Sequence, residues 1–402
     1  MSITATLKSR GLIKDSTCDS FDDKDRFYVG FDPTADGLHV GSLLPIVISR
    51  FLVSQNKQVT LLIGTATAKI GDPSGKSKER SLLSQEQIET NHKAVQASLT
   101  KLVPGATIVA NHSWINQLSL FDFLRTIGKH VSVKKLLNMD SVKSRMDSEQ
   151  GISFTEFSYS LFQAFDFAWL ANEPSKRMEV QFGGSDQWGN ILAGIDLASK
   201  MFEINNLQAF TFPLLTKQDG TKFGKTESGA VWLDKNKLTP FGLFQFFVRL
   251  TDEETKELFP KLCLHLSDET IKQKQETLKG PRELQTFLAK EMVNLVHGSE
   301  ELKEAENQTK LVFETKSNDS SSLSEEQIFI CKEPSIELMK FIVEVGWCKS
   351  NNEARRLVDA GGIRIDDVTC IDQKILLSKE THPQGCWIVK GKKHKKFLKF
   401  ND

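Results

Sequence analysis

Phe27-Tyr28-Val29-Gly30-Phe31-Asp32-Pro33-Thr34-Ala35-Asp36-Gly37-Leu38-His39-Val40-Gly41-Ser42 is the stretch that decides the fold of this chain. Its apolar first third predicts a buried strand that ends at Asp32-Pro33, because proline cannot donate to a ladder. The apolar run 43–53 predicts a helix, whose first backbone N–H groups can bind an anion. Gly41 lets a ligand approach the backbone closely. The pattern predicts a nucleotide phosphate site in an α/β domain. An ordinary strand–helix turn with a solvated His39 is the alternative.

Length and composition limit the class of protein. The 402 residues predict two or three domains, and 39% hydrophobic with 26% charged residues is typical of a soluble globular chain. The formal net charge is zero, so any binding of nucleic acid has to come from local patches. The chain has no C-x-x-C pair, no apolar run long enough to span a membrane and no signal-peptide core. This predicts a cytoplasmic protein without membrane attachment, zinc site or disulfide framework. The six cysteines are scattered at Cys18, Cys263, Cys331, Cys348, Cys370 and Cys386.

A second predicted strand, 58–63, leads into another polar loop. This loop contains Asp72 and ends in Gly75-Lys76-Ser77, but Ile70 stands where the P-loop pattern requires glycine. A P-loop is therefore excluded. Asp72 still falls at the carboxyl edge of a parallel sheet, where ligands bind in open α/β sheets.

The segment that follows mixes helices with one strand. Ser84-Gln85-Glu86-Gln87 fits a capping box and predicts a helix to about residue 101. A strand is predicted at 107–110 and an amphipathic helix at 118–127.

The segment 155–170 is predicted to be a helix with a polar stripe. Tyr159, Gln163 and Asp166 share one face at i, i+4 and i+7. The aromatic residues around that stripe make full exposure unfavourable, and buried polar side chains need partners. A bound ligand or neighbouring backbone can supply them, and the residues alone favour neither. The chain has 27 Phe and only two Tyr, Tyr28 and Tyr159, which suggests that hydroxyl groups matter at both positions.

Two later loops carry glycine and charged residues. The segment 180–187 predicts a strand that ends in Gly183-Gly184, with Asp186 suited to the hydroxyls of a ribose. A helix-capping turn is the alternative. Lys222 and Lys225 lie three positions apart on a further loop, for which a solvated basic loop is the ordinary interpretation.

The pattern changes after about residue 235. Thr239-Pro240 and the periodic apolar residues of 281–297 predict an all-helical domain, and 316–324 reads as a polar linker. The module 335–402 follows, with two predicted helices, short strands and a basic tail. It holds 13 Lys and Arg against 9 Asp and Glu. This surplus of four suggests contacts with phosphates, and a solvated basic tail is the alternative.

Together these motifs resemble those of the class I aminoacyl-tRNA synthetases, most closely the bacterial-type tyrosyl-tRNA synthetases. That family carries the strand of 27–31 followed by a His-x-Gly-His turn. It also carries the Gly-Gly-Ser-Asp-Gln-Trp-Gly-Asn segment found at 183–190 and the Lys-Phe-Gly-Lys-Thr loop found at 222–226. The second His of the turn is Ser42 here, which can donate a hydrogen bond but cannot carry positive charge. The resemblance covers essentially the whole chain.

The resemblance implies an α/β protein with a Rossmann-like parallel-sheet catalytic domain over 1–215 and a dimer-interface insertion at about 106–150. A signature loop and helical anticodon-arm domain would occupy 216–325. A small α+β module of the S4 RNA-binding type would occupy 335–402. The implied enzyme activates L-tyrosine with ATP and transfers it to tRNA(Tyr), as a cytoplasmic homodimer. Mg²⁺ would arrive with ATP as substrate, and no metal or cofactor would be held permanently.

Roles follow from the resemblance residue by residue. Catalysis is expected from residues that bind the phosphates or close over them: Thr34, His39, Ser42, Lys222, Lys225 and Thr226. Tyrosine is expected to contact Tyr28 and Asp166 at its phenol, Asp72, Tyr159 and Gln163 at its α-amino group, and Gln187 near its carboxylate. ATP is expected at Asp32, Gly41, Gly183, Gly184, Asp186 and Lys225. RNA is expected at Arg355, Arg356, Lys392 and Lys393.

Two other functions remain open from the sequence. A tryptophanyl-type class I synthetase would share the motifs, but Asp166 with Tyr28 favours a phenol over an indole. A non-catalytic RNA-binding relative would keep the fold and lose the chemistry. Ser42 points that way, whereas His39 and the two lysines of the 222–226 loop argue against it.

Overall fold

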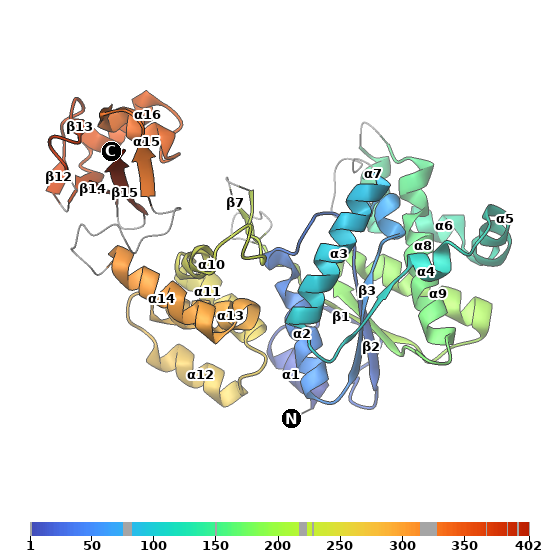
Figure 1. Cartoon of the computed structure of the whole chain (residues 1–402). Coiled ribbons are helices and arrows are strands. Elements are labelled where there is room, and N and C mark those ends of the chain that lie inside the picture. The colour runs from blue at the N-terminus through green and yellow to red at the C-terminus, as the bar shows by residue number, and fades with distance from the viewer. Residues whose placement is uncertain are drawn as a thin grey trace. The chain divides into compact units, whose positions relative to one another are not determined.

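The structure, a computed structural model, describes residues 2–74, 83–148, 151–216, 223–226, 229–313, 328–366, 368–383, 385–391 and 394–401. The chain divides into two compact units, Met1–Val296 and His297–Asp402, which are described separately (Figure 1). The helices are α1 (Ile3–Ser9), α2 (Leu43–Ser54), α3 (Gln85–Leu102), α4 (His112–Ile115), α5 (Leu120–Asp122), α6 (Val133–Leu137), α7 (Asp140–Met146), α8 (Phe154–Asn172), α9 (Trp188–Phe202), α10 (Pro240–Val248), α11 (Asp252–Leu262), α12 (Asp268–Thr277), α13 (Glu283–His297), α14 (Ser299–Phe313), α15 (Leu338–Glu344) and α16 (Asn351–Asp359).

The strands are short and fall into separate sheets. They are β1 (Asp15–Ser16), β2 (Arg26–Phe31), β3 (Gln58–Ile63), β4 (Thr107–Ala110), β5 (Val180–Gly184), β6 (Gln208–Phe212), β7 (Lys225–Thr226), β8 (Gly229–Ala230), β9 (Ile328–Cys331), β10 (Ser335–Glu337), β11 (Ile363–Ile365), β12 (Val368–Cys370), β13 (Leu376–Ser378), β14 (Cys386–Lys390) and β15 (His394–Phe400).

The first unit is built on a six-stranded sheet with the order β1-β6-β5-β2-β3-β4. Neighbouring strands are parallel except β1, which pairs antiparallel with β6. From β2 the chain moves outward to β3 and β4, and from β5 it moves outward the other way to β6. The strand order therefore reverses between β2 and β5, and ligands bind at the carboxyl ends of strands at such a point. Helices α2 and α3 cover one face and α8 and α9 the other (Figure 1).

The predicted elements of this sheet are confirmed. The predicted strands 58–63 and 107–110 coincide with β3 and β4. The capping box at Ser84 forms in both directions, since its hydroxyl accepts from the Gln87 amide and the Gln87 side chain accepts from the Ser84 amide. The two-residue strand β1 was not predicted, because so short a segment carries no periodic signal.

The insertion 106–150 differs from its prediction. A regular helix was predicted at 118–127, but α5 is followed there by a π-helical turn at Phe123–Ile127. The Thr126 hydroxyl donates to the Asp122 carbonyl oxygen at 2.6 Å, and such side-chain bonds compete with the regular helical ladder. Leu120 and Phe121 are 70% and 75% exposed. Burial within this chain therefore does little to hold the start of this segment, whereas Ile127 at its end is buried in the core.

Helices α10 to α13 complete the first unit. The Thr239 hydroxyl caps α10, as predicted, by accepting from the Gly242 amide at 3.1 Å. Arg10, which ends α1, is 4% exposed and joins the N-terminal helix to this part of the unit. Its Nε donates to the Asp268 carboxylate at 2.6 Å, and its other nitrogens donate to backbone carbonyls of 260 and 266.

The second unit contains a five-stranded sheet with the order β12-β11-β14-β15-β9 and a separate pair, β10-β13. Helices α15 and α16 bury apolar side chains in the same core, which matches the predicted α+β composition. Helix α15 begins at Leu338, because Ser335–Glu337 before it pair with β13. The three domain ranges of the sequence interpretation stay predictions. Among the described helices, none is both long and apolar enough to cross a membrane.

Candidate active site

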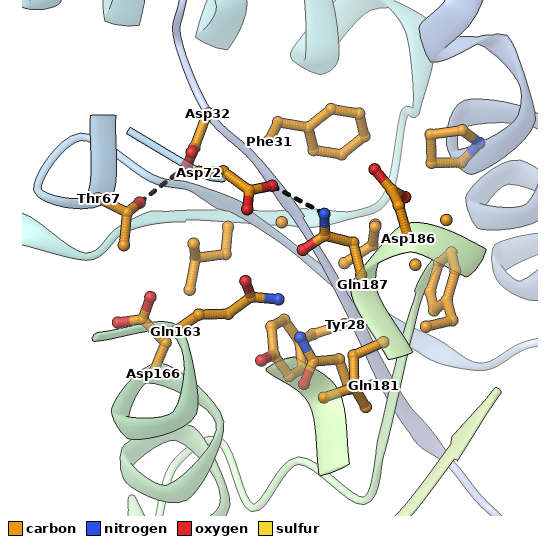
Figure 2. Close-up of a pocket in the computed structure, with 18 of the residues that line it drawn as sticks. Tyr28, Phe31, Asp32, Thr67, Asp72, Gln163, Asp166, Gln181, Asp186 and Gln187 are labelled. Carbon is orange, nitrogen blue, oxygen red and sulfur yellow. Dashed lines mark hydrogen bonds between the residues drawn. The ribbon is translucent and has the colours of Figure 1, made fainter. Parts of the chain in front are cut away.

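A cavity of about 330 Å³ opens at the carboxyl ends of the strands, where the strand order reverses. It is lined by five separate segments of the chain, within 28–45, 62–72, 159–166, 181–191 and 212–214. Figure 2 shows many of them pointing into a shared space. Thirteen of the residues predicted from the sequence line it: Tyr28, Asp32, Thr34, Gly41, Ser42, Asp72, Tyr159, Gln163, Asp166, Gly183, Gly184, Asp186 and Gln187.

Asp166 lies at the closed end of the cavity and is 2% exposed. One carboxylate oxygen accepts from Trp114 Nε1 at 2.8 Å, and the other accepts from Asn111 Nδ2 at 3.0 Å. Both donors are neutral. Burial raises the pKa of this carboxyl to about 7, because these two hydrogen bonds only partly offset the loss of solvent. Among the described residues, no cation forms an ion pair with this buried carboxylate.

Three polar atoms of other residues that line the cavity are buried without a hydrogen-bond partner among the described residues: Tyr28 Oη, Gln163 Oε1 and Gln181 Oε1. Figure 2 shows Gln163 reaching toward Tyr28 from α8 and Gln181 from the opposite side. Tyr28 and Gln181 occupy directly paired positions of β2 and β5. Burial, and then the nearby charge of Asp166, raise the pKa of the Tyr28 hydroxyl well above its ordinary value. Buried polar atoms of this kind indicate a ligand that supplies the missing hydrogen bonds.

Asp32 organises the wall next to this end. Its carboxylate accepts from Thr67 Oγ1 at 2.8 Å and from the Tyr159 hydroxyl at 2.8 Å. A Cβ on Gly64 would lie 1.9 Å from Asp32 Oδ1, so only glycine fits at that position. The sequence interpretation placed Asp32 on ATP, and the structure shows that its carboxylate also fixes the Tyr159 hydroxyl.

The cavity lining contains a second carboxylate with fixed partners. Asp72 Oδ2 accepts from Gln187 Nε2 at 2.8 Å, and Asp72 Oδ1 accepts from the Ser74 amide at 2.9 Å (Figure 2). Asp186, one residue before Gln187, lines the cavity beside the two glycines of β5. The end of β5 and the start of α9 thus place a carboxylate, Asp186, and an amide, Gln187, at the same edge of the cavity.

At the turn that leads into α2, His39 contacts the backbone of the turn and not the cavity. His39 Nδ1 accepts from the Gly41 amide at 3.0 Å and so caps the short turn Val40–Ser42. Its side chain does not line the cavity, whereas Gly41 and Ser42 do. The capping contact belongs to the ordinary-turn interpretation of His39, and a role toward phosphates stays a prediction.

The predicted lysine loop is described only in part. Lys222 lies outside the described residues, and Lys225–Thr226 form β7, paired antiparallel with β8. The Val40 amide donates to the Val231 carbonyl oxygen at 2.9 Å, and the Val231 amide donates to the Gly224 carbonyl oxygen at 2.9 Å. This backbone ladder brings the end of the loop to the helix entrance.

The predicted RNA residues belong to the second unit. Arg355 and Arg356 are exposed on α16, and Lys392 and Lys393 lie outside the described residues. Their role stays a prediction.

Sequence reasoning missed four cavity or supporting residues: Thr67, Asn111, Trp114 and Gln181. Asn111 follows the predicted strand 107–110 directly, and the rule that singled out Asp32 at a strand end would also have found it. Gln181 is a polar residue inside a predicted buried strand, which was a usable signal. The sequence around Trp114 and Thr67 gave no such signal.

Comparison with known proteins agrees with this geometry. The family model for tRNA synthetases class I (W and Y) matches residues 22–314. The chain belongs to the class I tRNA synthetases. Within this family it is 41% identical to the tyrosine–tRNA ligase of Aliivibrio fischeri, with 96% of each chain covered. It is 39% identical to that of Neisseria meningitidis, over all of this chain and 96% of the relative. This similarity places it with the bacterial-type tyrosyl-tRNA synthetases.

Solved structures of the class I synthetases share the fold. The chain matches a C-terminally truncated mitochondrial tyrosyl-tRNA synthetase of Aspergillus nidulans with a TM-score of 0.69 and 30% identity. That match covers 77% of this chain and 94% of the other. A tryptophanyl-tRNA synthetase of Plasmodium falciparum matches with a TM-score of 0.55 at 15% identity, which shows the fold alone.

Proposed function

We propose that this synthetase activates L-tyrosine with ATP and transfers it to the 3′ end of tRNA(Tyr). The observation that carries the proposal is the closed end of the cavity, where Asp166 has only neutral partners and the Tyr28 hydroxyl has none among the described residues. A phenol fits both, since its O–H can donate to the carboxylate and its oxygen can accept from Tyr28. An indole offers one N–H donor and no acceptor, so the same pair favours tyrosine over tryptophan.

The first step needs no protein nucleophile. A carboxylate oxygen of tyrosine attacks the α-phosphorus of ATP, a new P–O bond forms, and the bond to the β-phosphate bridging oxygen breaks to release pyrophosphate. Catalysis then rests on alignment and on donors directed at the phosphate charge. We assign tyrosine's ammonium to Asp72, Tyr159 and Gln163, and the ATP ribose to Asp186.

The phosphates are assigned to the helix entrance and the adjoining loop. Thr34, Ser42 and the backbone at Gly41 would face the departing group, with His39 beside them. Lys222, Lys225 and Thr226 would close over it. Mg²⁺ would enter bound to the phosphates of ATP, as part of the substrate. In the second step a ribose hydroxyl of the tRNA attacks the tyrosyl carbonyl carbon, and AMP leaves.

The test is amino-acid-dependent ATP–pyrophosphate exchange with each of the twenty amino acids. We expect exchange with tyrosine and almost none with phenylalanine or tryptophan. Exchange with tryptophan alone would identify the alternative specificity. No exchange with any amino acid, combined with retained binding of tRNA, would identify a non-catalytic RNA-binding relative.

We also propose that the chain forms a homodimer through the insertion. Large apolar side chains are exposed along it and at the start of α8: Leu120, Phe121, Leu124, Val133, Met146 and Phe154. Three of them, Leu120, Leu124 and Phe154, line a hollow of about 530 Å³. Contiguous apolar surface of this kind is typical of an interface. Replacing Phe121 by Asp should give monomers in sedimentation analysis. An unchanged sedimentation coefficient in this variant would contradict the assignment.

The second unit is proposed to be an S4-like module that binds tRNA. Exposed Arg355 and Arg356 on one helix and the surplus of basic residues support this role. The six cysteines are free thiols, which supports the cytoplasm as the proposed location. Truncation after residue 326 should abolish charging of tRNA and spare pyrophosphate exchange.

A further inference from the structure

Asn190 is a buried residue of α9 that no proposed role yet includes. It ends the Gly-Gly-Ser-Asp-Gln-Trp-Gly-Asn segment and is 2% exposed. Its side chain lies one helical turn after Gln187 and outside the cavity lining. A buried amide at this position needs partners, and the partner of its NH₂ group is a residue of the site.

The hydrogen bonds around Gln187 form a chain with a defined direction. Asn190 Nδ2 donates to Gln187 Oε1 at 3.1 Å, and Gln187 Nε2 donates to Asp72 Oδ2 at 2.8 Å. A carboxylate only accepts, so Gln187 has to turn its NH₂ group toward Asp72. Its oxygen then faces Asn190, which has to present its own NH₂ group. Asp72 and Asn190 thus hold the Gln187 amide in the same orientation from its two ends.

We infer that Asn190 is a positioning residue that orients the Gln187 amide and so holds the Asp72 carboxylate toward the ammonium group of tyrosine. The inference rests on the proposed function, because it takes Asp72 as the partner of that ammonium. Asp72 Oδ1 is already held by the Ser74 amide. With both bonds in place the carboxylate has one fixed orientation. With the Gln187 amide reversed, two oxygens would face each other and Asp72 would turn away.

The sharpest variant is Asn190→Asp, which keeps the size of the side chain and removes its donor. A carboxylate at position 190 competes with Asp72 for the Gln187 NH₂ group, so Gln187 no longer holds Asp72 in one orientation. We expect the KM for tyrosine in pyrophosphate exchange to rise about 10- to 100-fold, while the KM for ATP changes less than about twofold. Asn206→Asp, at an exposed position of the same unit, controls for the added charge and should leave both constants unchanged.

A second variant separates positioning from packing. In Asp72→Asn combined with Asn190→Asp, the whole chain of hydrogen bonds can reverse. The amide introduced at position 72 donates to Gln187 Oε1, and Gln187 Nε2 donates to the carboxylate introduced at position 190. The oxygen of the new amide can still accept from the Ser74 backbone N–H. We expect the double variant to recover most of the melting temperature lost in Asn190→Asp, while tyrosine binding stays weak because position 72 has no carboxylate. A residue that only packs would show no such rescue.

The outcomes are distinguishable. Wild-type protein without tyrosine-dependent exchange would overturn the proposed function itself. Active wild-type protein with an unchanged KM for tyrosine in Asn190→Asp would overturn only the role of Asn190. If Asn190→Asp does not fold, the double variant decides: a folded double variant supports the hydrogen-bond chain, and an equally unfolded one overturns it.

Discussion

Helix α8 buries two carboxylates, one near its start and one in its second half, and their partners differ in charge. At the start of the helix, Glu156 forms a bidentate pair with Arg145 of α7, at 2.7 and 2.9 Å, and both side chains are almost fully buried. Ten residues later, Asp166 receives only the neutral N–H groups of Asn111 and Trp114. The Glu156 carboxylate has a charged partner within the protein. The second still has capacity for a donor, and its pKa of about 7 reports the cost of that arrangement.

This difference separates a structural from a functional buried charge. A guanidinium beside Asp166 would stabilise the charge, but it would also occupy the position proposed for the phenol. Neutral donors orient the carboxylate without filling that position. Sites that have to recognise a ligand commonly give up stability in this way.

The comparison is tested most strongly by Asp166→Asn. The asparagine keeps the shape but can accept from only one of the two donors and offers the phenol a weaker partner. We expect kcat/KM for tyrosine in pyrophosphate exchange to fall by about 10⁴-fold, since a polar site that loses a buried partner discriminates on that scale. The melting temperature should not fall. A variant with near-normal activity would show that Asp166 is structural, like Glu156.

Arg145→Met should have the opposite profile. Removing one partner of a buried ion pair leaves the other uncompensated, so the free energy of unfolding should fall by about 3–5 kcal/mol in denaturant titration. The tyrosine/phenylalanine selectivity of the folded fraction should not change. Combining Arg145→Met with Glu156→Leu should restore most of the stability. If selectivity changes instead, the two carboxylates of α8 are not independent.

The pH dependence of stability should also distinguish the two carboxylates. The folded-state pKa of Asp166 is about 7, above its ordinary value of 3.8. Between these values the folded protein holds a proton that the unfolded chain has released, so this carboxyl makes stability fall as pH rises. The loss between pH 4 and 7 should be about 3 kcal/mol without ligand. Comparing melting curves of wild-type protein and Asp166→Asn isolates this contribution, and parallel pH profiles would contradict it.

Tyr28→Phe should give the smallest of these effects. Tyrosyl enzymes as a class are the standard example of hydroxyl-based selectivity, about 10⁵ against phenylalanine. We expect the variant to lose roughly 10- to 100-fold of that ratio, with unchanged or slightly higher stability, because the removed hydroxyl has no partner among the described residues. Competition between the two amino acids in pyrophosphate exchange measures the ratio. An unchanged ratio would remove Tyr28 from the phenol site.

Local signals in the sequence predicted four of the six strands of the sheet, β2 to β5, and most polar residues of the cavity, whereas β1 and β6 were not predicted. Strand ends followed by Asp32, Asp72 and Asp186 gave the cavity lining, since parallel strands bring their carboxyl ends together. The partners of Asp166 could not be found in this way. Trp114 and Asn111 lie more than fifty positions before it, and no local spacing reports such a pair. The helix predicted at 118–127 is helical only from Leu120 and continues as a π-helical turn, a change that no residue spacing reports.

The buried Arg10 has a practical consequence for handling the protein. Its three hydrogen-bonded contacts fasten the residues just after α1 to helices far along the sequence. Trimming the leading segment to improve crystallisation would remove this fastening and expose three acceptors. Affinity tags are therefore better placed through a spacer upstream of Ser2 than fused into the first turn.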